Sequence, residues 1–209
     1  RIILGSETAS TVSSRGTYHF PAKIGAAIIH DDHQSSSYDT EYCWWSNIPD
    51  NDFAADEDYP WCIGQFVWTG FDYLGEPSPY DTDAWPNHSS VFGIVDLAYI
   101  PKDRFYLYRS QWNKKDETLH ILPHWNWEGR EGETTPVFVY TSYPCAELFV
   151  NGVKEDHIEL SSGDVFYKDL DASKGENRLT LIFPSHESGV ITEVTLSKDA
   201  KARRYQHTF

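Results

Sequence analysis

The sequence predicts an α/β fold at residues 1–115, followed by an all-β domain at residues 116–209. Two short runs, Arg1–Gly5 and Trp61–Trp68, are apolar on both faces, which is typical of parallel strands covered by helices. All eight tryptophans lie before residue 128, and the chain then changes to short alternating apolar runs separated by Gly, Asn, Asp and Ser. This change in texture indicates a domain boundary near residues 113–120.

The elements of the first part are few. The run Arg1–Gly5 ends at Ser6-Glu7, and the second run ends at Trp68. Proline favours the first turn of a helix, so Pro101 predicts a helix over roughly 101–113, with Phe105, Tyr108 and Trp112 as its apolar face. Two strands with their helices cannot close a barrel or bury both faces of a parallel sheet. We therefore expect residues 1–115 to be the tail of a larger domain.

The second part predicts short antiparallel strands. Asn151-Gly152 is a strong two-residue hairpin signal, because both turn positions need positive φ. Six or seven short strands in this length favour an antiparallel, immunoglobulin-like sandwich. The candidate strands are Thr118–Leu122, Val137–Thr141, Ala146–Val150, Val165–Leu170, Arg178–Phe183 and Val190–Leu196.

The charge balance excludes several classes of partner. The 209 residues carry 17 Lys and Arg against 32 Asp and Glu, a net charge of −15. Such a surface repels phosphate backbones and anionic lipids, so we expect no nucleic-acid partner. No apolar run approaches the ~18–20 residues that a membrane span needs, and the first residues show no signal-peptide pattern. The three cysteines are sparse and suggest neither a disulfide scaffold nor a zinc knot.

One carboxylate follows the first apolar run directly. Glu7 lies within Gly5–Ser10, among small residues that leave room for a ligand. Catalytic groups of α/β barrels lie at the carboxyl ends of the strands, so Glu7 is a candidate catalytic residue. From its position alone, an ordinary loop carboxylate is the favoured interpretation of Glu7, because one Glu after a strand is a weak signal.

Aromatic and acidic residues follow the second run. Trp68, Phe71 and Tyr73 come with Asp72 and Glu76. Sugars present an apolar C–H face that stacks on a ring, and hydroxyls that need charged acceptors, so this mixture indicates a carbohydrate site. The alternative interpretation places these aromatic residues in the core.

Other chemistries lack their motifs. The nine histidines show no metal-ligand spacing, and we interpret the one cluster, residues 30–33, as a solvated loop. No GxSxG, P-loop or GxGxxG motif is present. The sequence therefore predicts no metal and no required cofactor.

Several segments resemble glycoside hydrolase family 2, in its bacterial β-galactosidase branch. They appear in family order and span residues 1 to about 150, with a looser match beyond residue 130. The segments are Ser6–Gly16, Gly64–Pro77, Phe92–Ala98, Pro101–Tyr108, His120–Trp127, Val137–Thr141 and Ala146–Gly152.

The resemblance implies the C-terminal part of a (β/α)8 TIM barrel, holding its last two strands, followed by an immunoglobulin-like domain. Glu7 would end strand seven as the nucleophile, and Trp68 would end strand eight in the galactose subsite. The family retains configuration by using a second carboxylate as acid and base. The implied partners are a β-galactoside oligosaccharide or glycan and the missing N-terminal part of the same enzyme. The family also favours a periplasmic or secreted bacterial protein.

The sequence departs from the family pattern in two places. The family's acid/base is a Glu preceded by Asn, and no Asn-Glu pair occurs in this chain, so we expect the chain to be inactive alone. Asp72 and Glu76 do not replace that residue; with Tyr73, they are expected to contact sugar. The position before Phe66 is often Glu in relatives and is Gln65 here, a variation to which the sequence attaches no consequence.

The resemblance also bears on substrate specificity, because this chain lacks a lysine motif of one branch of the family. The β-glucuronidase branch carries Asn-x-Lys just before the segment that matches Gly93, whereas His88–Phe92 holds no Lys. This favours a neutral sugar, and thus cleavage of terminal β-galactosides. The alternatives are another family 2 specificity, β-glucuronidase or β-mannosidase, and a non-catalytic carbohydrate-binding or docking module that uses Trp125 and Trp127.

Overall fold

The computed structural model contains two compact units, residues Arg1–Phe105 and Tyr106–Phe209, which we describe separately. The predicted domain limits, 1–115 and 116–209, stay a prediction. The structure describes residues 1–23, 25–79, 85, 87–124, 126–127, 129–130, 135–142, 146–150, 153–154, 178–183, 191–198 and 201–205.

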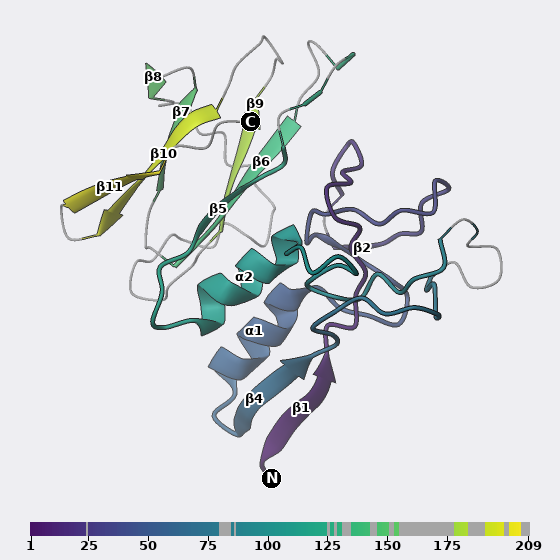
Figure 1. Ribbon diagram of the computed structural model, residues 1–209. Helices are drawn as coiled ribbons and strands as arrows, with labels where there is room; N and C mark the ends of the chain where they lie inside the picture. The colour runs from purple at the N-terminus through teal and green to yellow at the C-terminus, as the bar shows by residue number, and fades with distance from the viewer. Residues whose placement is uncertain are drawn as a thin grey trace. The chain divides into compact units, whose positions relative to one another are not determined.

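The first unit contains the predicted pair of parallel strands. β1 (Ile3–Thr8) and β4 (Cys62–Val67) lie side by side and run in the same direction (Figure 1). Their register pairs Ile3 with Cys62 and Thr8 with Val67. The first apolar run was expected to end at Ser6-Glu7, but β1 continues through Thr8, so Glu7 belongs to the strand.

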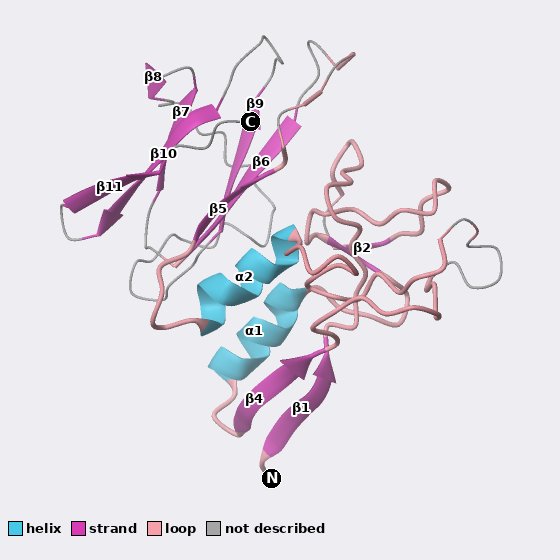
Figure 2. Cartoon of the chain, in the orientation of Figure 1, coloured by secondary structure: helices cyan, strands magenta, loops and turns pink. Residues whose placement is uncertain are grey.

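Helix α1 (Pro49–Asp58) packs on β4 and was not expected from the sequence (Figure 2). Pro49 occupies its first turn, and Asp50 and Asp52 bring negative charge to its N-terminus, where the helix dipole favours it. The helix holds few apolar residues, so hydrophobic periodicity gives no signal for it.

The segment between β1 and α1 has a polar interior. Its two short strands, β2 (Ala26–Ala27) and β3 (Glu41–Tyr42), pair in parallel. Ser35, Ser36 and Ser37 are buried, and the Ser14 amide donates to the Ser35 carbonyl at 2.9 Å. Hydrogen bonds, rather than apolar contacts, therefore hold much of this segment together.

Helix α2 (Asp103–Trp112) begins later than expected. Pro101 was predicted in its first turn, but it forms an isolated β-bridge with Val95. The Lys102 amide donates to the Ile94 carbonyl at 3.0 Å. These contacts hold residues 101–102 outside the helix.

The buried face of α2 also differs from the prediction. Arg104, Leu107 and Tyr108 are fully buried, whereas Trp112 is 43% exposed and Phe105 is half-buried. The buried residues share the i, i+3, i+4 spacing of one helix face. Hydrophobicity alone misses this face because its largest member is an arginine.

The second unit forms two antiparallel sheets. One has the order β5 (Leu119–Leu122), β6 (Thr135–Thr141), β9 (Arg178–Phe183), and it buries Ile121, Leu122 and the consecutive residues 137–140. The other has the order β11 (Lys201–Tyr205), β10 (Ile191–Lys198), β7 (Ala146–Val150), β8 (Val153–Lys154).

The α/β and then all-β order is confirmed, and five of the six predicted strands are present. The predicted strand Val165–Leu170 and the predicted turn Asn151-Gly152 lie outside the described residues. The strands on either side of that turn pair antiparallel, with Phe149 opposite Lys154. β11 was not predicted.

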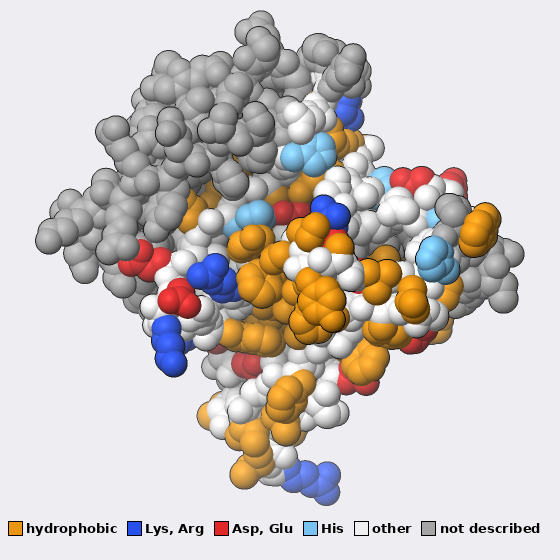
Figure 3. Space-filling model, viewed as in Figure 1, with side chains coloured by type: hydrophobic (Ala, Val, Ile, Leu, Met, Phe, Trp, Pro, Cys, Tyr) orange, Lys and Arg blue, Asp and Glu red, His pale blue; other side chains and the backbone are white. Residues whose placement is uncertain are grey.

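The sheet of β1 and β4 leaves apolar side chains in the open. Ile3, Leu4, Ile63 and Phe66 are between 50% and 64% exposed. Figure 3 shows hydrophobic side chains gathered at the lower end of the molecule, where β1 lies in Figure 1. Among the described helices, none has the length and apolar character that crossing a membrane requires.

Candidate functional site

Glu7 and Trp68 lie together where the two parallel strands end. Thr8 pairs with Val67, and the Trp68 amide donates to the Thr8 carbonyl at 3.0 Å. Trp68 directly follows the end of β4, and Glu7 is the residue before Thr8, so the backbone places the two residues at the same end of the strand pair. The structure thus brings together the two residues on which the sequence prediction mainly rests.

The Glu7 carboxylate is accessible. Its side chain is exposed, and none of the ion pairs between described residues includes it. The Ser10 hydroxyl donates to Glu7 Oε1 at 3.5 Å, a long hydrogen bond. Trp68, whose amide donates to the residue after Glu7, is 37% exposed, so part of its side chain is also accessible. Such a carboxylate can act as a nucleophile or base toward a ligand held against the indole.

The turn after Glu7 is held in a demanding conformation. Ala9 and Ser10 have φ of 56° and 50°, a left-handed region that costs non-glycine residues about 1–3 kcal/mol each. Asp52 of α1 accepts the Ala9 amide at 2.7 Å, and the Asn47 amide donates to the Ala9 carbonyl at 2.9 Å. Burial raises the pKa of Asp52, and the Ala9 amide opposes that rise. α1 therefore fixes the backbone next to Glu7.

Gln65 joins both strands to α1. Thr8 Oγ1 donates to Gln65 Oε1 at 2.6 Å, and Gln65 Nε2 donates to Asp56 Oδ2 at 2.6 Å. A carboxylate at this position could not donate to Asp56, so the amide is the form that satisfies both neighbours. The structure gives a reason for Gln65 that the sequence did not supply.

We expect Gln65→Glu to destabilise the protein by about 1–3 kcal/mol at neutral pH, because it loses a donor and puts a second carboxylate beside Asp56. The introduced carboxyl should have a higher pKa in the folded state than in the unfolded state, because a neighbouring carboxylate opposes its ionisation. The free energy of unfolding of the variant should therefore be highest at acidic pH and should fall as the pH rises through the folded-state pKa of this carboxyl. Thermal unfolding at pH 4.5 and 7.5 measures the difference.

The control for this change is Gln111→Glu, which makes the same substitution on α2 beside the cation Lys114. Lys114 Nζ donates to the Gln111 carbonyl at 2.7 Å, so a carboxylate there meets favourable charge. Equal effects of pH on the two variants would contradict the role given to Gln65.

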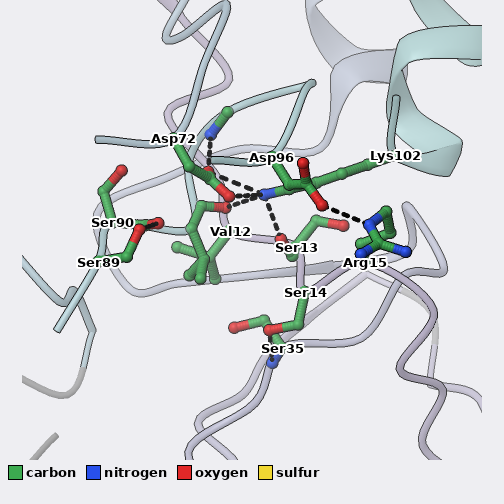
Figure 4. Close-up of polar contacts among 12 residues, drawn as sticks. Val12, Ser13, Ser14, Arg15, Ser35, Asp72, Ser89, Ser90, Asp96 and Lys102 are labelled. Atoms are coloured by element: carbon green, nitrogen blue, oxygen red, sulfur yellow. Dashed lines mark hydrogen bonds and ion pairs between the residues drawn. The ribbon is translucent and has the colours of Figure 1, made fainter. Parts of the chain in front are cut away.

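The Asp72 carboxylate is directed into the protein (Figure 4). Its side chain is 7% exposed, its oxygens lie 2.8 and 2.9 Å from Lys102 Nζ, and the Gly93 amide donates to Oδ1 at 2.7 Å. Lys102 Nζ also donates to the carbonyls of Ser13 and Val91. Asp72 was expected to contact sugar; its partners here are within the protein, and they indicate a bracing role.

Burial dominates the ionisation of this pair. It raises the pKa of Asp72 and lowers the pKa of Lys102 to about 8, while the mutual attraction of the two charges opposes both shifts.

The loop after β4 comes very close to its neighbour at Gly93. A Cβ there would lie 2.1 Å from the Asp72 amide nitrogen, so only glycine fits.

Tyr73 and Glu76 lie beside Trp68. The Tyr73 and Trp68 rings meet edge to face with centroids 6.1 Å apart, and the Tyr73 hydroxyl donates to Glu76 Oε2. Burial and the neighbouring Glu76 raise the pKa of Tyr73 to about 12, so its hydroxyl keeps its proton at neutral pH. Of the predicted sugar-contacting residues, the structure brings Tyr73 and Glu76 to Trp68.

Arg104 holds the segment that follows the Glu7 turn. Its guanidinium donates to Asp39 Oδ1 at 2.6 Å and to the carbonyls of Thr11 at 2.7 Å and Val12 at 3.0 Å. Arg104 and Asp39 are almost completely buried. Close by, Arg15 pairs with Asp96 (Figure 4).

Asp52, Lys102 and Arg104 have structural roles that were not predicted from the sequence. Each contacts residues tens of positions away in the chain, so no local spacing could have revealed it. Lys102 and Arg104 lie within Pro101–Tyr108, a segment that resembles the family, but the resemblance assigned them no role; Asp52 lies among polar residues that give no signal.

Comparisons with known proteins add the following. No family model matches the chain. It is 38% identical over 175 residues to the β-galactosidase BoGH2A of Bacteroides ovatus, covering 79% of this chain and 19% of that protein. It is 27% identical over 182 residues to a β-glucuronidase of Bacteroides fragilis, covering 82% of this chain and 25% of that protein.

A solved structure is also similar. A β-glycosidase from Bacteroides vulgatus matches with a TM-score of 0.72 and 28% identity, covering 97% of this chain and 27% of that one. The chain therefore spans roughly a fifth to a quarter of the length of these three proteins.

Proposed function

Because this chain belongs to glycoside hydrolase family 2, we propose that Glu7 is the catalytic nucleophile of a retaining β-galactosidase. The observation that carries the proposal is the meeting of Glu7 and Trp68 at the ends of two hydrogen-bonded parallel strands. In the retaining mechanism, a carboxylate oxygen attacks the anomeric carbon while the glycosidic bond breaks and an acid residue protonates the leaving oxygen. Water then hydrolyses the resulting glycosyl ester.

The proposed scaffold is a (β/α)8 barrel in which β1 and β4 are the last two strands, with residues 1–115 in the barrel and residues 116–209 in an immunoglobulin-like domain. Barrel strands are apolar on both faces and are covered on both. The exposed Ile3, Leu4, Ile63 and Phe66 support this proposal, because further strands and helices would cover them. Those elements would come from residues outside this sequence.

The second carboxylate would also come from outside this sequence. Retaining enzymes need an acid/base residue about 5–5.5 Å from the nucleophile. The family places it after Asn, and this chain has no Asn-Glu pair. We therefore propose that residues 1–209 alone do not turn over substrate, since losing general acid catalysis costs about 10²–10⁴-fold even before the incomplete pocket is counted.

Trp68, Tyr73 and Glu76 would form the wall of the sugar subsite. The exposed indole offers a face for the apolar side of the ring, and the Tyr73 hydroxyl and Glu76 offer polar groups beside it. Asp72 would act indirectly, by fixing the loop that carries Tyr73. The proposed partner is thus a glycan with a terminal β-galactoside.

A second specificity has some support. The similar B. fragilis protein is a β-glucuronidase, and a uronic acid differs from galactose by a carboxylate that needs a cation. The segment His88–Phe92 supplies no lysine, which favours the neutral sugar. A non-catalytic carbohydrate-binding module, the remaining alternative, would bind sugar without being labelled by a mechanism-based reagent.

The test is covalent labelling of the full-length protein. A 2-deoxy-2-fluorogalactosyl inactivator should form a stable ester, and peptide sequencing should find the label on Glu7. Label on any other residue would overturn the nucleophile assignment, and labelling only by the corresponding glucuronosyl reagent would overturn the galactoside specificity. The Glu7→Gln variant is the control and should take up no label.

A further inference from the structure

We propose that His19, His30 and Glu41 form a binding site for a divalent transition-metal ion, with zinc as the best match. The site would tie together the long segment between β1 and α1. It does not depend on the proposed function, and its test uses no enzymatic readout.

The fold brings the three side chains together from separate parts of the segment. Each offers one ligand atom, and these atoms all lie within 4.8 Å of one another. His30 follows β2, and Glu41 begins β3; the parallel pairing of Ala26 with Glu41 fixes their approach. His30 Nε2 lies 2.6 Å from Glu41 Oε2.

A second observation points to a ligand. His19 Nδ1 and Glu41 Oε1 are buried, and neither has a hydrogen-bond partner. The Glu41 side chain is 9% exposed. Leaving a buried polar atom unsatisfied costs about 1–3 kcal/mol, so unpaired atoms on two members of one cluster need an explanation. A bound cation would satisfy both.

The outer contacts of His19 fit the same interpretation. Its Nε2 lies 2.9 Å from Asp32 Oδ2. A metal-ligating histidine commonly donates its second ring N–H to a carboxylate, which fixes the tautomer that leaves the other nitrogen free to bind. Here the bound nitrogen would be Nδ1, the buried atom without a partner. Hydrogen bonding alone explains the His19–Asp32 and His30–Glu41 pairs but leaves Nδ1 and Oε1 unexplained.

The donor set selects the ion. Two imidazoles and one carboxylate suit zinc, which binds nitrogen at about 2.0–2.1 Å and leaves a fourth position for water. The His19 and His30 rings are stacked, with centroids 3.5 Å apart and planes 9° apart. A metal ion lies in the plane of each imidazole that binds it, so one ring must turn out of this stack when zinc enters.

The consequence of binding would be mechanical. The three ligands span residues 19–41, and the Glu41 carbonyl accepts the Thr11 hydroxyl at 3.4 Å. Asp39, two residues before Glu41, pairs with Arg104. An ion at this site would therefore stabilise the segment that packs against residues 11 and 12, which follow the Glu7 turn.

The test is calorimetric titration of chelator-treated, full-length protein with zinc chloride, together with thermal unfolding. Wild-type protein should bind one zinc equivalent that His19→Gln and Glu41→Gln weaken at least about 100-fold. Zinc should raise the unfolding temperature of the wild type but not of these variants. The control is His33→Asn, which alters the other histidine of the 30–33 cluster and suits its φ of 58°; it should bind zinc like the wild type.

Two outcomes would overturn the proposal. One is zinc binding that His19→Gln and Glu41→Gln leave unchanged. The other comes from X-ray absorption at the zinc edge of the wild-type protein, which needs no variant to fold. The proposal expects nitrogen and oxygen ligands at about 2.0–2.1 Å, and two of these ligands should be imidazoles. A wild-type spectrum without imidazole ligands would contradict the proposal.

Discussion

Glu7→Gln is expected to lower kcat of the full-length enzyme toward a nitrophenyl β-galactoside by about 10⁴-fold or more. A carboxamide cannot form the glycosyl ester, so the first chemical step loses its nucleophile. The change should leave folding intact, because Glu7 is exposed and its hydrogen bond with Ser10 is long. Steady-state kinetics and thermal unfolding of the same preparation measure both effects.

Glu57→Gln is the matched control. It makes the same chemical change on an exposed carboxylate of α1, outside the proposed site. Its kcat should equal that of the wild type. If Glu7→Gln kept more than a few per cent of wild-type activity, the proposed nucleophile would be wrong.

Arg104→Met is expected to have the largest effect on stability, a loss of about 3–5 kcal/mol. It would remove the cation that pairs with the fully buried Asp39 and the donors to the Thr11 and Val12 carbonyls. Differential scanning calorimetry of the full-length protein should show the transition that contains this unit lowered by about 10 °C.

Two further variants test the cause. Arg109→Met removes a cation from the last turn of the same helix and should cost only about 0.3–1 kcal/mol. Arg104→Lys keeps a charge for Asp39 but lacks the planar fork that reaches two carbonyls, so it should fall between the other two. If Arg104→Met were as stable as Arg109→Met, the buried network would not have the role we give it.

Apolar runs and turn signals predicted the fold where local pattern is sufficient. The β1 and β4 runs are apolar on both faces, and they pair in parallel as expected. β9 matches its predicted bounds because a short apolar run lies between the polar pair Glu176-Asn177 and Pro184, and a proline cannot donate to a strand ladder. α1 was missed because half of its ten residues are acidic, and the helix depends on its N-terminal Pro49 and on packing against β4.

The sequence placed Glu7 and Trp68 at the ends of two strands, but it did not identify the residues that support them in the structure. Glu7 and Trp68 follow apolar runs, so their positions were readable from the chain. Asp72 looked the same as Tyr73 and Glu76 in the sequence, yet its carboxylate is directed toward Lys102. Similarly, the 30–33 cluster was interpreted as a solvated loop, but His30 is half-buried against Glu41.

The sequence by itself determined the order of the α/β and β parts, the family and the residue proposed as nucleophile, because these depend on hydrophobic period and short motifs that are local in the chain. Only the tertiary structure decided which charged residues are buried, which of them brace the Glu7 turn, and which histidines meet. Those outcomes depend on contacts between residues up to 93 positions apart, such as Thr11 and Arg104. Whether such a charge is stable depends on the hydrogen bonds that it meets in the folded interior.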